Sequence, residues 1–189
     1  MNKSIILVGV GGQGTILASK LLTIGLMEAG YDVKMSEIHG MAQRGGSVSS
    51  QVRYGDQVYS PVIELGGADM MVAFEKMEGL RWLEYLKPDG KAIINNHQIN
   101  SMPILNGKAD YPANIETLLT ELVNATFIDA ANMAESLGNT KVMNIILLGT
   151  VIKTMQLDTI NWERIIAENV KPQFVDLNCH ALKLGMAQV

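Results

Sequence analysis

Short apolar runs alternate with amphipathic segments along the first part of this chain and predict strands and helices in turn. Residues 4–9 form an apolar run typical of a buried strand, and residues 13–29 carry apolar side chains at helical spacing. Residues 32–36 predict a second strand. The order strand, turn, helix, strand is typical of a parallel α/β sheet.

The same pattern continues to the end of the chain. Further strands are predicted at residues 70–74, 91–95 and 126–129, and helices after residue 74, from Asn114, over residues 141–155, from Asn161 and from Pro172. Residues 48–54 and 57–63 flank a turn and predict a β-hairpin, which would add antiparallel strands. We therefore expect a Rossmann-like, mostly parallel sheet flanked by helices, in a single domain that covers residues 1–189.

Composition excludes several classes of protein. Hydrophobic residues make up 48% of the chain and charged residues 18%, which favours a packed core over disorder. The net charge of −4 argues against a general nucleic-acid binder. The longest apolar runs, such as residues 145–152, are far shorter than the roughly 20 residues of a bilayer span. We expect a soluble cytoplasmic protein with no nucleic-acid or membrane partner.

Metal and thiol chemistry have little support in the sequence. Cys179 is the single cysteine, whereas a cysteine-ligated iron–sulfur cluster needs several thiolates. The three histidines are scattered without metal-ligand spacing. We expect no metal site in this chain, and we interpret Cys179 as a packing residue rather than a nucleophile.

A glycine-rich turn follows the first predicted strand. Gly9, Gly11 and Gly14 have the spacing of a dinucleotide-binding turn, with Gly12 between them. The free N–H groups of the following helix could bind an anion, and Glu37 lies near the position of a ribose-binding acid. Close packing of helix against strand is the alternative reason for these glycines.

The segment 37–47 is the second candidate site, because it places acid, imidazole, amide and guanidinium groups in one loop. The candidate residues are Glu37, His39, Gly40, Gln43, Arg44, Gly45 and Gly46. Arg44 could make a forked contact with a phosphate or carboxylate, and Gly45 and Gly46 could turn backbone N–H groups toward an anion. The alternative is a surface loop in which Arg44 pairs with Glu37.

Polar residues also stand at several predicted strand ends, and in a parallel sheet they would converge on one rim. They are Glu75, Asn95, Asn96, His97 and Asp129. Helix capping is the simpler interpretation of each, as for Asp129 before a helix that starts at Ala130.

Three segments in this order resemble the gamma domain of the 2-oxoacid:ferredoxin oxidoreductases: residues 9–15, residues 37–47 and Tyr59-Ser60-Pro61. The long loop is most similar to that of the indolepyruvate ferredoxin oxidoreductase beta subunits. The resemblance implies oxidative decarboxylation of arylpyruvates with thiamine diphosphate, transfer of the acyl group to coenzyme A, and electron flow to ferredoxin. It further implies that a larger alpha subunit holds thiamine diphosphate, Mg²⁺ and [4Fe-4S] clusters. This chain would then be a small subunit without catalytic residues, inactive alone and part of a hetero-oligomer.

The thiamine diphosphate signature of such enzymes, Gly-Asp-Gly with a later Asn-Asn, is missing here. Pro88-Asp89-Gly90 and Asn95-Asn96 mimic it, but the first glycine is absent and the spacing is too short. Two alternatives stay open: a stand-alone NAD(P)-dependent enzyme that uses the glycine turn and Glu37, and a non-catalytic assembly subunit.

Overall fold

The computed structural model describes residues 2–39 and 45–189. The strands are β1 (Lys3–Val10), β2 (Asp32–His39), β3 (Ser47–Gly55), β4 (Ala68–Ala73), β5 (Leu86–Asn95) and β6 (Asn124–Ile128). The α-helices are α1 (Thr15–Glu28), α2 (Lys76–Arg81), α3 (Met102–Leu105), α4 (Ile115–Leu122), α5 (Ala130–Ser136), α6 (Met143–Thr154), α7 (Trp162–Asn169) and α8 (Val175–Met186). Short 3₁₀ turns are η1 (Leu83–Tyr85), η2 (Thr140–Val142) and η3 (Pro172–Phe174).

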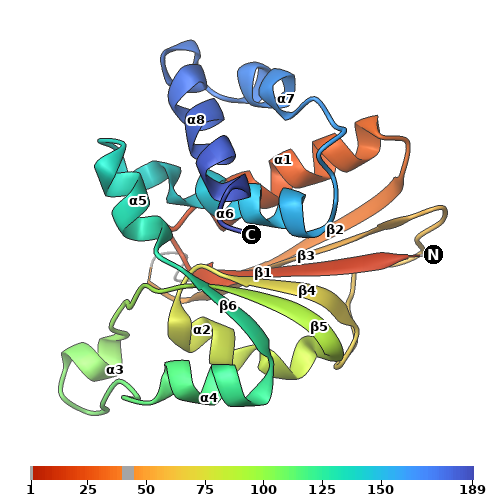
Figure 1. The fold of residues 1–189 in the computed structure, drawn as a ribbon. Coiled ribbons are helices and arrows are strands. Elements are labelled where there is room, and N and C mark those ends of the chain that lie inside the picture. Colours follow the sequence, from red (N-terminus) through yellow and green to blue (C-terminus); the bar gives the residue numbers. More distant parts are fainter. Residues whose placement is uncertain (1, 40–44) are drawn as a thin grey trace.

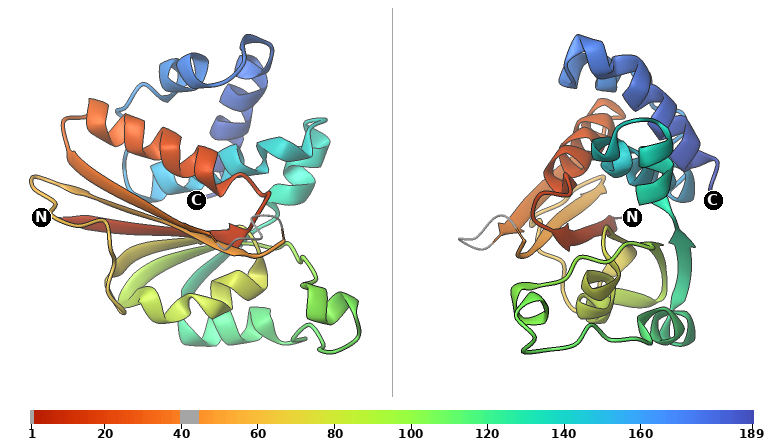
Figure 2. Two further views of the ribbon diagram at one scale, coloured as in Figure 1. Left: turned by 180° about the vertical axis from the view of Figure 1, so that it is seen from behind. Right: turned by 90° about the vertical axis from the view of Figure 1, so that its left-hand side faces the viewer.

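The strands form one sheet in the order β2-β3-β1-β4-β5-β6, with helices on both faces (Figure 1). Helices α1, α5, α6, α7 and α8 lie on one face, and α2 and α4 lie on the other (Figure 2). Strands β1, β4, β5 and β6 pair in parallel, whereas β3 is antiparallel to both β1 and β2. The predicted α/β class, with a mostly parallel sheet and an antiparallel hairpin, is confirmed.

The partner in that hairpin was wrongly predicted. Strand β3 pairs with β2 and separates it from β1, while residues 57–63 form no strand. The alternation in this segment arises because Val58 and Ile63 are buried beside the sheet. Side chains of β3, rather than the backbone of a neighbouring strand, bond the backbone of this segment. Gln51 Oε1 accepts from Ile63 N at 2.7 Å, and Arg53 Nη1 donates to Val62 O at 3.0 Å.

Two apolar clusters lie on opposite faces of the sheet. One joins α1 and α6 to the sheet through residues such as Leu22 and Ile146, and the other joins α4 to it through Leu119 and Ile94. Helix α6 is buried over residues 143–152, which confirms the buried helix predicted there. Among the described helices, none is both long and apolar enough to cross a membrane.

Candidate functional site

The parallel strands β1, β4, β5 and β6 all end at one edge of the sheet, and the carboxyl ends of strands are where open α/β sheets place their sites. The glycine turn after β1 lies at this edge, beside the start of α1 (Figure 1). Gly12 and Gly14 have φ values of 108° and 84°, a region that L side chains rarely adopt. A Cβ atom on Gly9 would stand 2.9 Å from the Phe74 Cβ atom, so both backbone shape and close packing require glycine here.

The side chain of Gln13 fixes this turn, whereas the sequence pattern had indicated only the neighbouring glycines. Its Oε1 atom accepts from Val10 N at 2.8 Å, and its Nε2 atom donates to Phe74 O at 2.9 Å. The second of these bonds connects the turn to the end of β4. The residues next to Gln13 in the sequence do not predict this contact.

The glycine turn and the end of the candidate loop are bonded to each other. Gly11 N donates to Gly46 O at 2.8 Å, and Gly45 N donates to Gly11 O at 3.2 Å. The structure thus brings together the two glycine segments that the sequence singled out separately. It also engages the N–H group of Gly45 inside the chain.

The other end of the candidate loop is anchored through Glu37. Its Oε1 atom accepts from the Ser19 hydroxyl at 3.2 Å, which links edge strand β2 to α1. His39 is the last residue of β2. Gly40, Gln43 and Arg44 lie outside the described residues, so the proposed contact of Arg44 with an anion stays a prediction.

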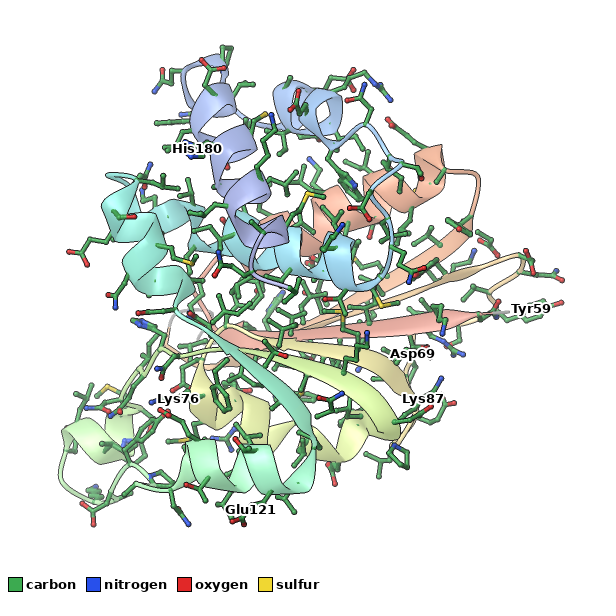
Figure 3. The ribbon with its side chains drawn as sticks, in the orientation of Figure 1. Tyr59, Asp69, Lys76, Lys87, Glu121 and His180 are labelled. Carbon is green, nitrogen blue, oxygen red and sulfur yellow. The ribbon has the colours of Figure 1, made fainter. Side chains whose placement is uncertain are left out.

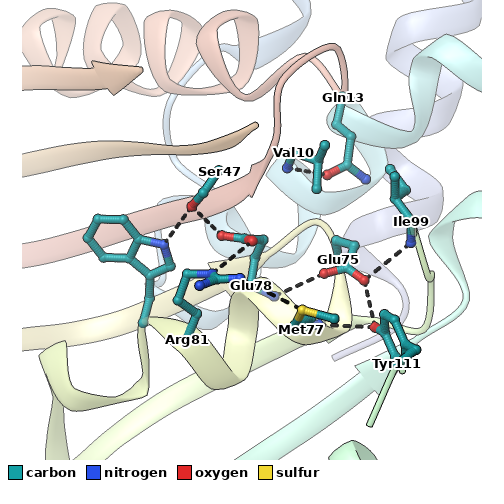
Figure 4. A network of polar contacts seen from close by, with 10 residues as sticks. Val10, Gln13, Ser47, Glu75, Met77, Glu78, Arg81, Ile99 and Tyr111 are labelled. Carbon is teal, nitrogen blue, oxygen red and sulfur yellow. Dashed lines mark hydrogen bonds and ion pairs between the residues drawn. The ribbon is translucent and has the colours of Figure 1, made fainter. Parts of the chain in front are cut away.

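Glu78 holds the base of the loop from the neighbouring helix α2 (Figure 4). Ser47 Oγ donates to Glu78 Oε2 and accepts from Trp82 Nε1 at 3.2 Å. Arg81 Nε donates to the second oxygen of Glu78 at 3.1 Å. Glu78 is only 5% exposed, so this carboxylate acts as a buried acceptor rather than a solvated surface charge.

Glu75 is a second buried carboxylate at the end of β4, 1% exposed. It caps α2 by accepting from Glu78 N at 2.9 Å, as the capping interpretation predicted. It also accepts from the Tyr111 hydroxyl at 2.6 Å and from Ile99 N at 3.2 Å (Figure 4). Burial, followed by the hydrogen bond to Glu75, raises the pKa of Tyr111, so this phenol stays protonated and keeps donating.

Asn95, rather than Asp129, satisfies the start of α5, which corrects the predicted cap. Asn95 is fully buried at the end of β5, and its Oδ1 atom accepts from Ala130 N at 3.0 Å. Its Nδ2 atom donates to Phe74 O at 3.0 Å, the carbonyl that Gln13 also reaches. The carboxylate of Asp129 instead accepts from the Asn132 side chain at 2.6 Å.

A cavity of about 530 Å³ opens beside the glycine turn. Its lining includes Gly12, Gly14, Gln13, His97, Asn132 and Lys141, so the predicted rim residue His97 does meet the glycine turn here. Backbone and side-chain donors of this kind can bind an anion or a polar ligand. Among residues 2–39 and 45–189, no group of three or more histidine, cysteine, aspartate or glutamate side chains could hold a metal ion.

Cys179 does not fit an iron–sulfur cluster, and the residues that mimic the thiamine signature do not fit thiamine diphosphate. Cys179 is half-buried on α8, and burial raises the pKa of its thiol, which disfavours the thiolate that a cluster requires. The apparent thiamine signature is spread along β5. Gly90 and Asn95 are five residues apart in this strand, or roughly 16 Å at 3.3 Å per residue, so they cannot converge on one group.

A family model and two curated proteins match nearly the whole chain. Residues 4–188 match the family model described as "Pyruvate ferredoxin/flavodoxin oxidoreductase". The chain is 38% identical over 194 residues to indolepyruvate oxidoreductase subunit IorB of Archaeoglobus fulgidus, covering 100% of this chain and 96% of that protein. It is 37% identical over 189 residues to the subunit of the same name from Pyrococcus horikoshii, covering 97% and 94%.

Solved structures share the fold at lower identity. The gamma subunit of a keto/oxoacid ferredoxin oxidoreductase from Geobacter sulfurreducens has a TM-score of 0.72 at 24% identity, over 98% of this chain and 97% of that chain. The 2-oxoglutarate:ferredoxin oxidoreductase of Magnetococcus marinus, solved with 2-oxoglutarate, coenzyme A and succinyl-CoA bound, has a TM-score of 0.73 at 18% identity, over 99% of this chain and 31% of that chain. The family match and the near full-length relatives confirm the resemblance read from the sequence. The chain therefore belongs to the pyruvate ferredoxin/flavodoxin oxidoreductase family.

Proposed function

We propose that this chain is the small subunit of an indolepyruvate-type 2-oxoacid:ferredoxin oxidoreductase. The observation that carries this proposal is its similarity, over nearly the full length of both chains, to two indolepyruvate oxidoreductase subunits. The site geometry supports the same role. The described residues build a rigid edge from backbone pairs and buried carboxylates, but no redox centre.

This role assigns the oxidative decarboxylation to a larger alpha subunit. That partner holds thiamine diphosphate, Mg²⁺ and [4Fe-4S] clusters, passes electrons to ferredoxin and transfers the acyl group to coenzyme A. The small subunit contributes its carboxyl edge to the boundary of the partner's active site. Within that edge, Arg44 holds an anionic group, either a phosphate of coenzyme A or the carboxylate of the substrate.

Three contacts flank the segment that carries Arg44. Glu37 is bonded to Ser19 before the loop, and the Gly11–Gly46 and Ser47–Glu78 contacts follow it. These described flanking residues are already ordered by the fold, so their ordering costs little entropy when a ligand or a partner binds at this edge.

Reconstitution tests the proposal. The isolated chain should not reduce viologen dye with indolepyruvate, even when thiamine diphosphate, Mg²⁺ and coenzyme A are present. Addition of the cluster-bearing subunit should restore turnover and saturate at a fixed subunit ratio. Dye reduction by the pure isolated chain, or full activity of the large subunit without this chain, would overturn the proposal.

A further inference from the structure

Strand β2 forms one edge of the sheet, and its outer side has no partner among the described strands. Its eight residues pair with β3 in an uninterrupted register, from Asp32 opposite Gly55 to His39 opposite Val48. The strand contains neither a proline nor a bulge, two of the features by which proteins protect a sheet edge. An edge of this kind readily pairs with another strand.

The acidic and basic side chains of β2 do not block this edge, because each is matched within the chain. Lys34 forms an ion pair with Asp32, which also accepts from Val58 N at 2.8 Å. Glu37 accepts from the Ser19 hydroxyl at 3.2 Å. These contacts allow a second strand to approach without burying an unpaired charge.

Apolar side chains are exposed on both faces of the sheet beside this strand. Ile16 and Met27 are 54% and 60% exposed on the outward stripe of α1, where they lie three helical turns apart. Met35 of β2 adjoins this stripe, because Thr23 Oγ1 donates to its sulfur at 3.4 Å. Ile38 is 51% exposed on the opposite face, since successive strand residues point to alternate faces. We call β2 together with Ile16, Thr23 and Met27 the β2 edge surface.

Helix α1 is apolar on all of its sides, a composition typical of a helix that is buried all round. Lys20 and Glu28 are the only charged residues among its 14. Leu22 is fully buried on the inward side, whereas the outward stripe with Ile16 and Met27 meets solvent. Exposed apolar surface of this kind marks an interaction site. The composition of α1 therefore fits an assembly in which its outward stripe is covered.

We propose that the β2 edge surface binds a second copy of this chain, with the two β2 strands antiparallel across a two-fold axis. A two-fold axis perpendicular to the sheet continues the two sheets edge to edge and brings the two α1 helices together on one face. The surface is complementary to itself in charge. Lys20 and Lys34 balance Asp32 and Glu37, whereas the chain as a whole carries a net charge of −4.

The size of the surface favours the same occupant. Strand β2 is about 27 Å long at about 3.4 Å per residue, and α1 is about 21 Å long at about 1.5 Å per residue. A strip about 25 Å long and roughly 20 Å wide covers about 500 Å² per copy and about 1,000 Å² in total, which reaches the size of a specific interface. An interface of this size predicts a weak dimer. The inference does not rest on the proposed function.

Sedimentation equilibrium of the full-length chain tests the dimer over a range of protein concentrations. The chain should form dimers and no larger species, because a two-fold interface covers the edge in both copies. Met27→Lys and Ile38→Lys place a charge on either face of the interface and should each raise the Kd of the dimer at least about tenfold, or about 1.4 kcal/mol. The matched control is Met102→Lys, whose methionine is 64% exposed on α3, and it should leave the Kd unchanged.

Amide hydrogen exchange locates the interface within the chain. Exchange over residues 32–39 should slow as the dimer forms, while β6, the opposite edge strand, should exchange at the same rate in monomer and dimer. Comparison of dilute and concentrated samples of the same protein provides this measurement.

Three results would overturn the proposal: a chain that stays monomeric at the highest concentration, a dimer that both lysine variants leave as tight as the control does, or slower exchange in β6 instead of β2. Slower exchange of β2 only after the larger subunit is added would assign the surface to that subunit and reject the second copy. The dye assay of the reconstituted enzyme is scored separately, so a dimer without turnover would reject the proposed function alone.

Discussion

At the scale of single residues, Asp69 shows how one carboxylate joins several elements at the amino edge of the sheet (Figure 3). Its oxygens accept from Lys87 Nζ at 2.7 Å, Ser4 N at 2.8 Å and Lys3 Nζ at 3.4 Å. Burial raises the pKa of Asp69, but the hydrogen bonds from Lys87 and Ser4 and the two lysine charges outweigh burial. The pKa in the folded chain is therefore below its ordinary value of 3.8.

Asp69→Asn should lower the free energy of unfolding at neutral pH and lose this effect in acid. A carboxyl group whose pKa is lower in the folded state than in the unfolded state stabilises the fold at pH values above its unfolded-state pKa. This contribution disappears as the pH falls through the folded-state pKa. Urea denaturation from pH 7 down to pH 3 should show the difference between the two proteins shrinking below about pH 4. A difference independent of pH would contradict this assignment.

Arg44 carries the residue-scale test of the proposed boundary site. Arg44→Lys keeps the positive charge but removes the planar fork, so activity of the assembled enzyme should fall while the melting temperature of this chain changes little. Arg164→Lys, at an exposed ion pair with Glu168, is the control and should leave activity unchanged. Full activity of Arg44→Lys with unchanged KM for both substrates would show that the fork has no role.

At the scale of elements, α6 and α8 cross through glycines. A Cβ atom on Gly185 would overlap the backbone carbonyl of Ile146, and one on Gly149 would overlap that of Leu182. The backbone of the facing helix cannot move out of the way as the end of a flexible side chain can. Gly185→Ala should therefore destabilise the fold by about 1–3 kcal/mol in denaturant titrations, although alanine favours helix by about 1 kcal/mol.

The control for that variant is His180→Ala, at an exposed position of the same helix, which should change stability little (Figure 3). Equal stabilities of Gly185→Ala and His180→Ala would show that the two helices can separate at no cost.

A second element-scale prediction concerns the segment between β5 and α4. The Tyr111 hydroxyl ties it to Glu75, so Tyr111→Phe should speed amide hydrogen exchange over residues 99–113 and leave β1 unchanged. Tyr85→Phe, another partly buried tyrosine, is the control. Exchange unaffected by Tyr111→Phe would mean that Ile99 N and the remaining contacts hold the segment without the phenol.

The elements that sequence patterns predicted correctly are those with a local cause. Residues 141–155 are nearly all apolar and fold as a buried helix, and Asn161 caps α7 by accepting from Arg164 N at 3.2 Å. Residues 57–63 were wrongly predicted to form a strand, because burial of Val58 and Ile63 against the sheet produces the same alternation of apolar and polar residues as a strand. The partners that decide the outcome, Gln51 and Arg53, lie on another element.

The same distinction between local and distant causes applies to the candidate site. Spacing alone located the glycine turn, and composition located the loop after β2. The roles of Gln13 and Glu78 were not predicted, and Asn95 was identified only as a polar residue at a strand end, because the partners of all three are distant along the chain. Long-range hydrogen bonds of this kind require the fold before they can be recognised.

At the scale of the whole molecule, the glycine turn raises the question of a dinucleotide cofactor, and we predict that the purified chain holds neither NAD nor FAD. It should show no flavin absorbance and no saturable change in NADH fluorescence at sub-millimolar ligand. A Kd below about 100 μM, or roughly 5.5 kcal/mol of binding, would favour a stand-alone NAD(P)-dependent enzyme instead.

The place of β3 between β1 and β2 has a consequence for how the chain acquires its structure. Strand β2 cannot join the sheet in the order of synthesis, because β3, its one neighbour among the described strands, comes after it along the chain. The β2–β3 hairpin is local, whereas its attachment through Ser50 opposite Leu7 closes a long stretch of chain. Closing long loops slows folding. We therefore expect the hairpin to form early and its docking onto β1 to limit the folding rate, so that a nascent chain ending before residue 47 would leave the first strand without its antiparallel partner.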